Sequence, residues 1–326
     1  MSQSFDIAVI GATSLAGEAL FELLDEHELP PGELIPLAAD ETGSQTVSCR
    51  GRNLRVRDLH GFDFSRTALV LALEPLAAAQ RERIVAAGCR LVELAGGSEA
   101  APCVVATVNP QALAAQVRSP LPAVVALAGV LAPLTSVLEL QRLTVTACLA
   151  VSGRGREGIE ELARQTAQLL NARPLEPGLF GRQIAFNLLA ASSAAGEDGS
   201  HDEQRLVTEL REVLERPALP VSATCVQAPV FFGDSLSVSL LCAAPVSLAA
   251  VEAALEAAGD IELCAADDWP TAVGDAVGQE RIHVGRLRVA ADDPCRLDLW
   301  IVSDNVRLGA ALNAVRLAGL LLKPNP

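Results

Sequence analysis

SPLPAVVALAGVLAPLTSVLELQRLTVTACLAVSGRG, residues 119–155, is the stretch that decides the fold, because an apolar segment, a strand-like segment and a glycine-rich turn follow one another without a gap. Its most apolar part, 123–134, is shorter than the roughly 20 residues that a membrane span needs. Prolines at 120, 122 and 133 interrupt it. We therefore predict a helix that is buried on all sides, followed by a strand and a turn.

Near the N-terminus, the motif GATSLAG at 11–17 follows the apolar run DIAVI and precedes apolar residues at helical spacing. This order predicts a strand, a glycine turn and a helix. Such a unit can hold a pyrophosphate at the helix N-terminus, with Gly11 making the turn and Gly17 allowing close helix packing. The candidate cofactor-binding residues of this turn are Gly11, Thr13, Ser14, Leu15, Ala16 and Gly17.

Two acidic residues, Asp40 and Glu41, follow the second predicted strand, 34–39. They stand about twenty residues beyond the glycines, where an acid binds the ribose 2′-hydroxyl of a dinucleotide. An acid at this place repels the 2′-phosphate of NADP, so we expect NAD in preference to NADP. The alternative is that these residues form a solvated loop and that no cofactor binds.

The remaining pattern predicts an α/β chain of two domains. Apolar strands at 67–73 and 90–94, separated by a helix-like segment, complete a βαβ alternation and imply a parallel sheet. The second half instead carries several strands without regular alternation, which suggests an α+β domain. These strands are expected at 236–243, 261–264, 282–289 and 297–302, with a helix at 248–258 among them.

Composition excludes several classes of function. The chain has 326 residues, is 50% hydrophobic and carries a net charge of −15, so phosphate repulsion argues against nucleic acid or an anionic membrane as partner. Its eight cysteines form no CxxC pair and mostly lie in apolar runs. We interpret them as reduced core residues of a cytoplasmic protein, with no metal site. The polar N-terminus gives no sign of a secretory signal.

LxPL at 131–134 followed by AVSGxG at 150–155 resembles the aspartate-semialdehyde dehydrogenase family, where the helix opens with NPNC and the strand ends in TYQAVSGAG. GATSLAG is similar to that family's GATGxVG, and QIAFN and DNVRLGAALNAV are similar to later family segments. The resemblance covers nearly the whole chain. It implies a Rossmann-type NAD(P)-binding domain with a parallel sheet, formed by residues 1–121 and 305–326, and an α+β dimerisation or substrate domain, 122–304.

In that family a cysteine thiolate attacks the aldehyde, a hydride leaves to NADP, and phosphate cleaves the thioester. The resemblance implies that this chain has other residues at the positions that matter for the reaction. Proline suits the first turn of a helix but offers no nucleophile, so we predict no catalytic residue at these places. The family's cysteine, its assisting glutamine, its substrate-binding arginine, its general-base histidine and its phosphate-binding arginine correspond to Pro122, Leu149, Gln227, Asp234 and Glu99.

The same resemblance places Ser152, Gly153 and Asn305 among the cofactor-binding residues. It also puts Glu203 and Arg205 where the family has an acid for the substrate amine and a lysine for phosphate. The alternative interpretation is that both are surface charges of an amphipathic helix. None of the four histidines falls on a catalytic position.

Cys148 and Cys225 are the only thiols near the family's catalytic positions, and each is a conceivable substitute nucleophile. Neither has a visible histidine to lower its pKa. We therefore interpret both as inert thiols.

Three hypotheses follow. The first is a Usg-type member of the family that lacks the catalytic cysteine and the reaction, and acts as a dimer by binding a nucleotide or a protein; the partner is a second copy or a true dehydrogenase paralogue. The second is an active NAD(P)-dependent oxidoreductase on an aldehyde or oxo substrate, with hydride transfer but no thioester. The third is a purely structural interaction protein.

Overall fold

The computed structural model describes residues 5–27, 32–39, 45–94, 96–98, 100–190 and 201–323. Asp40, Glu41 and Glu99 lie outside the described residues. The chain forms two compact units, residues 1–120 with 310–326, and residues 121–309. The sequence-based division at 121/122 and 304/305 stays a prediction. The backbone N–H groups of Leu308 and Gly309 donate to the carbonyl of Asp304, at 3.1 and 2.9 Å, and hold this segment to the residue that follows the last strand of the second unit.

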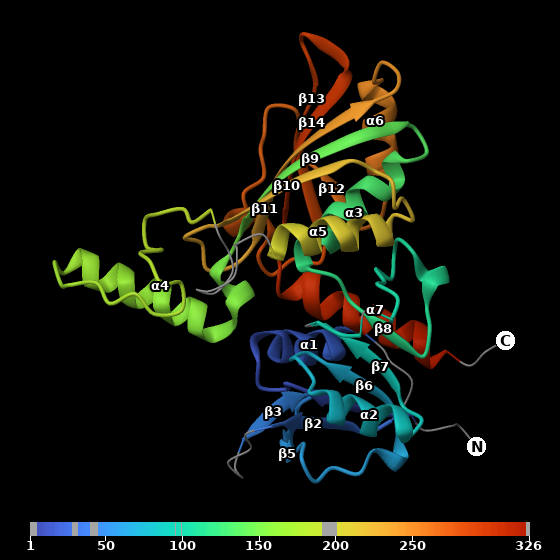
Figure 1. The fold of residues 1–326 in the computed structure, drawn as a ribbon, viewed down its shortest axis with the longest axis vertical. Coiled ribbons are helices and arrows are strands. Elements are labelled where there is room, and N and C mark those ends of the chain that lie inside the picture. The colour runs from blue at the N-terminus through green and yellow to red at the C-terminus, as the bar shows by residue number, and fades with distance from the viewer. Residues whose placement is uncertain are drawn as a thin grey trace. The chain divides into compact units, whose positions relative to one another are not determined.

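The first unit contains a six-stranded sheet in the order β5-β2-β1-β6-β7-β8, with every neighbouring pair parallel (Figure 1). This confirms the predicted Rossmann-type parallel sheet. Its strands are β1 (Asp6–Ile10), β2 (Leu34–Ala38), β5 (Arg57–Asp58), β6 (Thr67–Ala72), β7 (Arg90–Glu93) and β8 (Gln116–Arg118). Around it lie α1 (Leu15–Glu26), α2 (Ala78–Ala86), α7 (Asn313–Leu322) and a hairpin of β3 (Thr46–Cys49) and β4 (Arg52–Arg55).

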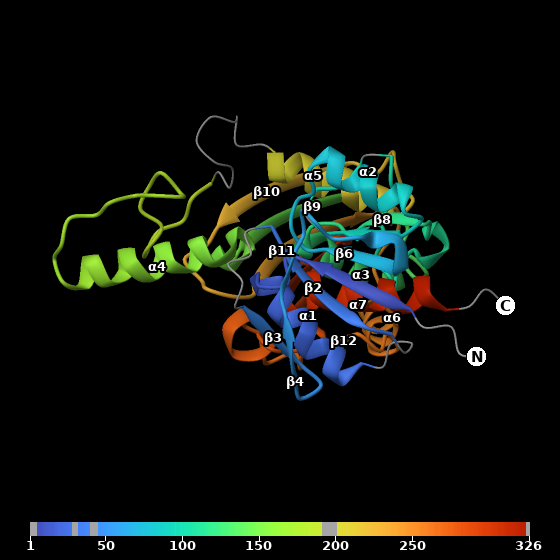
Figure 2. The same ribbon diagram turned by 90° about the horizontal axis from the view of Figure 1, so that it is seen from below.

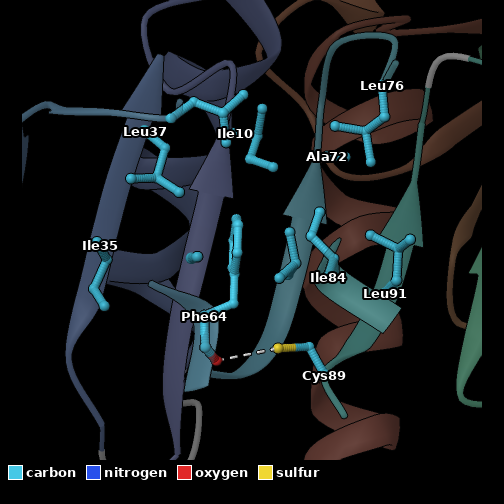
Figure 3. Close-up of a cluster of buried hydrophobic side chains, with 12 residues drawn as sticks. Ile10, Ile35, Leu37, Phe64, Ala72, Leu76, Ile84, Cys89 and Leu91 are labelled. Carbon is cyan, nitrogen blue, oxygen red and sulfur yellow. Dashed lines mark hydrogen bonds between the residues drawn. The ribbon is translucent and has the colours of Figure 1, made fainter. Parts of the chain in front are cut away.

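The core of this unit forms because the strands carry apolar side chains on both faces, as parallel strands covered by helices do. On one face, side chains from β1, β2, β6 and β7 pack with Ile84 of α2 and with Phe64 (Figure 3). The thiol of Cys89 closes this cluster by donating to the carbonyl of Phe64 at 3.5 Å. α7 packs on β6 and β7, and α1 packs on α7.

The second unit contains a mixed six-stranded sheet in the order β10-β9-β11-β14-β13-β12. The outer pairs β10–β9 and β13–β12 are parallel and the central pairs are antiparallel. The strands are β9 (Leu140–Leu149), β10 (Val221–Gln227), β11 (Asp234–Cys242), β12 (Ile261–Leu263), β13 (Ile282–Ala290) and β14 (Asp293–Ser303). The helices are α3 (Pro122–Leu134), α4 (Gly155–Leu170), α5 (His201–Val213) and α6 (Leu248–Glu256).

α3 is the central helix of this unit. It packs on β11, β13 and β14 and against α5 and α6. Most of its residues are buried on every side, as its uniformly apolar sequence predicts. α4 extends away from the sheet of this unit in both ribbon views (Figures 1 and 2). Among the described residues, no helix combines the length and the apolar character that crossing a membrane requires.

Candidate functional site

The glycine turn between β1 and α1 is built as its sequence predicts. Gly11 has φ +76°, and a Cβ on Gly17 would lie 2.4 Å from the carbonyl oxygen of Ala12. The Ser14 hydroxyl caps α1 by accepting from the Gly17 N–H at 3.1 Å, and it donates to the Gly11 carbonyl at 2.7 Å. The hydroxyl of Ser14 is therefore engaged within the turn. The role of Thr13, Leu15, Ala16 and the other turn residues in binding a nucleotide stays a prediction.

Pro122 is the first residue of α3, where its fixed φ and missing N–H fit the helix start. The N–H of Leu121, just before it, donates to a carboxylate oxygen of Glu209 on α5 at 2.7 Å. The proline also lies against the backbone of Gly309, since a Cβ on that glycine would come within 2.5 Å of the Pro122 Cβ. The start of α3 is thus occupied by a pyrrolidine ring and a carboxylate, and it presents no thiol.

Two buried side chains hold the end of β9. A carboxylate oxygen of Asp234 accepts from the Ala150 N–H at 2.9 Å. The amide nitrogen of Gln227 donates to the Leu149 carbonyl at 2.7 Å. Asp234 and Gln227 are only 4% and 1% exposed, so each of these hydrogen bonds satisfies a polar group that water does not reach. Both side chains therefore fix the backbone that leads into the AVSGRG turn.

Burial raises the pKa of Asp234 to about 7. The neighbouring carboxylate of Asp304 raises it further, while the N–H of Ala150 lowers it. A carboxyl near its ordinary pKa is a poor base at neutral pH unless burial raises that pKa. Asp234 is almost fully buried, and its desolvation disfavours the charged carboxylate.

Ser152 and Asn305, two predicted cofactor residues, lie against each other. The Asn305 amide nitrogen donates to the Ser152 hydroxyl at 2.9 Å, and its amide oxygen accepts from the Gly233 N–H at 2.9 Å. Both residues are buried. At Gly153, a Cβ would meet no atom within 4 Å. Asn305 thus joins the turns after β9, before β11 and after β14, and the binding of a cofactor by these residues stays a prediction.

The charged residues of α5 are not free surface charges. The Arg205 guanidinium pairs with Glu209 at 2.9 Å, one helical turn away. One carboxylate oxygen of Glu203 accepts from the Cys225 N–H at 3.0 Å, and its other oxygen is buried and has no hydrogen-bond partner among the residues that the structure describes. Arg154 pairs with Asp202 at 2.8 Å. The position expected for a phosphate-binding cation is therefore neutralised by a carboxylate.

The two candidate substitute nucleophiles lie in surroundings that keep them protonated. Burial raises the pKa of the Cys148 thiol, and the carboxylate of Asp234 adds to this effect. Burial also raises the pKa of Cys225 to about 12, with further contributions from Glu203, Asp202 and Asp234. Because the thiolate is the nucleophile, both thiols are poorly reactive at neutral pH.

Sequence reasoning missed two carboxylates that organise these surroundings. Glu209 contacts the start of α3, and the only available sign was its spacing from Arg205, which is typical of a helix ion pair. In the first unit, Glu93 at the end of β7 is 2% exposed and forms a bidentate ion pair with Arg81 of α2. The distances from the guanidinium nitrogens to the carboxylate oxygens are 2.7 to 3.1 Å. The side chain of Arg81 is thereby committed to a carboxylate.

We predict that Asp234→Asn makes the protein relatively more stable as the pH rises. The folded-state pKa of about 7 exceeds the unfolded value of about 3.9, so between these values the folded chain retains a proton that the unfolded chain has lost. The contribution of Asp234 to the stability of the wild-type protein therefore falls from about pH 4 to 7, and the variant lacks this loss. Urea unfolding at pH 5 and pH 8 should show the variant's relative stability growing by about 1 kcal/mol or more.

The matched control is Asp63→Asn. Hydrogen bonds from Ser65 lower the pKa of Asp63, so its carboxylate stays charged across this range. The difference between this variant and the wild type should not change from pH 5 to pH 8. An Asp234→Asn difference that is equally flat would show that Asp234 is ionised normally in the folded protein.

The chain matches two family models, described as the semialdehyde dehydrogenase NAD binding domain, over residues 6–116, and the semialdehyde dehydrogenase dimerisation domain, over residues 131–308. It is 51% identical to a USG-1 protein homolog of Azotobacter vinelandii, with 99% of each chain covered. It is 35% identical to aspartate-semialdehyde dehydrogenase 2 of Vibrio cholerae, again with 99% of each chain covered.

Solved structures agree with these matches. A probable aspartate-semialdehyde dehydrogenase from Pseudomonas aeruginosa has a TM-score of 0.93 at 49% identity, over 98% of this chain and 99% of that one. Aspartate semialdehyde dehydrogenase II from Vibrio cholerae, complexed with ASA, has a TM-score of 0.94 at 35% identity, over 99% of both chains. The resemblance inferred from the sequence is thereby confirmed, and the chain belongs to the aspartate-semialdehyde dehydrogenase family.

Proposed function

We propose that this member of the family no longer catalyses the dehydrogenase reaction and instead acts as a dimeric binding protein. The observation that supports this most is the start of α3, where Pro122 stands at the position that the family resemblance gives to the nucleophilic cysteine. A proline there preserves the helix and removes the thiol. In this proposal the chain binds a nucleotide, a protein or both.

The other positions support the same proposal. Gln227 and Asp234 make buried hydrogen bonds to the backbone of Leu149 and Ala150. Arg205 is neutralised by Glu209. These three side chains, at positions that the family would use on a substrate, therefore have structural partners in this chain, and function has to be argued from such contacts and not from the fold.

A homodimer is the assembly that we propose. The second unit matches a family model described as a dimerisation domain. A true dehydrogenase paralogue, with an equivalent domain, is the alternative partner that we propose. We propose neither nucleic acid nor an anionic membrane as a partner, because the net charge of −15 would repel their phosphates. The free state of all eight cysteines fits a reducing compartment such as the cytoplasm.

NAD is the nucleotide that we propose for the first unit, which matches an NAD binding domain. The turn from Gly11 to the Ser14 cap supports this proposal, since backbone N–H groups at a helix start favour a pyrophosphate. Preference over NADP rests on the acidic pair Asp40 and Glu41, which the sequence places beyond the second strand.

A second candidate function keeps an oxidoreductase role without a thioester. The observation that favours it is the pKa of Asp234, about 7, because a general base works best when its pKa lies near the operating pH. In this role Asp234 would take a proton from a hydroxyl or hydrate while a hydride passes to the nicotinamide. Only this candidate requires Asp234 for turnover.

We predict no phosphate-dependent reduction of NADP or NAD with aspartate semialdehyde, because no thiol is available to form the thioester. Absorbance of the reduced nicotinamide measures it, with the Vibrio cholerae enzyme as positive control. Pro122→Cys alone should not restore turnover, since Leu149, Gln227 and Asp234 remain. Phosphate-dependent turnover by the wild-type chain would overturn the proposal. Turnover that needs no phosphate and is lost in Asp234→Asn would favour the second candidate.

We also predict that NAD raises the melting temperature of the protein and that NADP does not. A ligand that binds only the folded state stabilises it in proportion to the logarithm of its concentration over Kd. The double variant Asp40→Ser, Glu41→Ser should lose the discrimination between the two nucleotides, while retaining stabilisation by NAD. If neither nucleotide moves the melting temperature, the nucleotide fold serves only as a scaffold.

A further inference from the structure

The turn between β6 and α2 carries an acidic residue, Glu74, two positions beyond the end of β6. β6 is the parallel neighbour of β1. The ends of the two strands lie side by side (Figure 3), because Ile10 pairs with Ala72 and the Leu73 N–H donates to the Ile10 carbonyl at 3.0 Å. Ligands of open α/β sheets bind beyond the carboxyl ends of such strands. Glu74 therefore lies at the same sheet edge as the glycine turn between β1 and α1.

The side chain of Glu74 packs directly on Gly11. A Cβ on Gly11 would lie 2.7 Å from the Cγ of Glu74 and 3.0 Å from its carboxyl carbon. Non-bonded carbon atoms pack at about 3.5 to 4.0 Å, so any side chain at position 11 would collide with Glu74. The absence of a side chain at Gly11 thus serves the packing of Glu74 as well as the shape of the turn.

The carboxylate of Glu74 is not neutralised by a neighbour. Glu74 is exposed, and no residue in the part of the chain that the structure describes forms an ion pair or a hydrogen bond with its carboxylate. Arg81, the first basic residue after it in the sequence, pairs with Glu93 instead. The turn that would hold a pyrophosphate therefore has an uncompensated carboxylate beside it.

This carboxylate and a pyrophosphate would require the same surroundings. The start of α1 favours negative charge, because the first backbone N–H groups of a helix have no partner within it. A dinucleotide uses this property by placing its pyrophosphate at the helix start. Glu74 already supplies a negative charge next to the turn, and like charges at such short range repel each other even in water.

We propose that the carboxylate of Glu74 opposes the pyrophosphate of a dinucleotide at the glycine turn, and that this side chain has to move away before the dinucleotide binds. The inference rests on the proposed binding of NAD by the first unit. It makes Glu74 the residue that limits the affinity of that site. NAD and NADP are affected alike, since both carry the pyrophosphate.

The test compares NAD binding by the full-length wild-type protein and by Glu74→Gln, measured by isothermal titration calorimetry. Glutamine keeps the size of the side chain and removes its charge. Glu74→Gln should bind NAD about tenfold more tightly, because a like charge beside the pyrophosphate is lost. Glu82→Gln is the matched control, since Glu82 is an exposed glutamate within α2 of the same unit. It changes the net charge equally and should bind NAD as the wild type does.

Salt gives a second readout that a change in packing would not affect. The Debye length falls from about 10 Å at 0.1 M to about 3 Å at 1 M ionic strength. The advantage of Glu74→Gln over the wild type should therefore shrink as salt is added. Glu74→Ala, which removes the stem together with the charge, should bind NAD at least as tightly as Glu74→Gln.

Equal affinity of the wild-type protein and Glu74→Gln for NAD would overturn the inference and leave the proposed function intact. A gain in Glu74→Ala that Glu74→Gln does not share would also overturn it, because bulk and not charge would then obstruct the turn. If none of these proteins binds NAD, Glu74 is not what limits binding, and the proposed binding of a nucleotide fails together with the inference.

Discussion

The carboxylate of Asp234, buried beside Asp304 and bonded to the Ala150 N–H, is the interaction on which the second unit's polar centre depends. Gln227 holds the adjoining carbonyl of Leu149, and Asn305 joins Ser152 to Gly233. Side chains thus hold the turns at the ends of three strands. A buried polar network of this kind stabilises one arrangement, because an unpaired member costs more than its bond contributes.

The family's fold and the family's reaction require different residues. The scaffold needs the parallel sheet, the glycine turn, the apolar α3 and the mixed second sheet, and all of these are present. The chemistry needs a thiolate, which requires a thiol with a lowered pKa. Burial and nearby carboxylates instead raise the pKa of Cys148 and Cys225. In our proposal the chain therefore retains the fold while its polar centre serves stability and binding.

Much of the fold followed from local patterns, because apolar periodicity and glycine turns are properties of neighbouring residues. The β3–β4 hairpin and β8 were missed, since these strands are only three or four residues long and each carries at most two apolar side chains. The site was less predictable. The partner of Gln227, the contact of Glu209 with the start of α3 and the raised pKa of Asp234 arise from tertiary contacts. The packing of Glu74 on Gly11 depends on the pairing of β1 with β6, which sequence alone does not specify.

Intact-protein mass spectrometry tests the central claim, the loss of the thioester chemistry, most directly. The protein would be incubated with aspartate semialdehyde and NAD or NADP in phosphate-free buffer, where an acyl-enzyme accumulates because nothing cleaves the thioester. The Vibrio cholerae enzyme, under the same conditions, shows that an adduct is detectable. Our account predicts an unchanged mass for this chain. A cofactor-dependent adduct on any of its cysteines, released on adding phosphate, would contradict it.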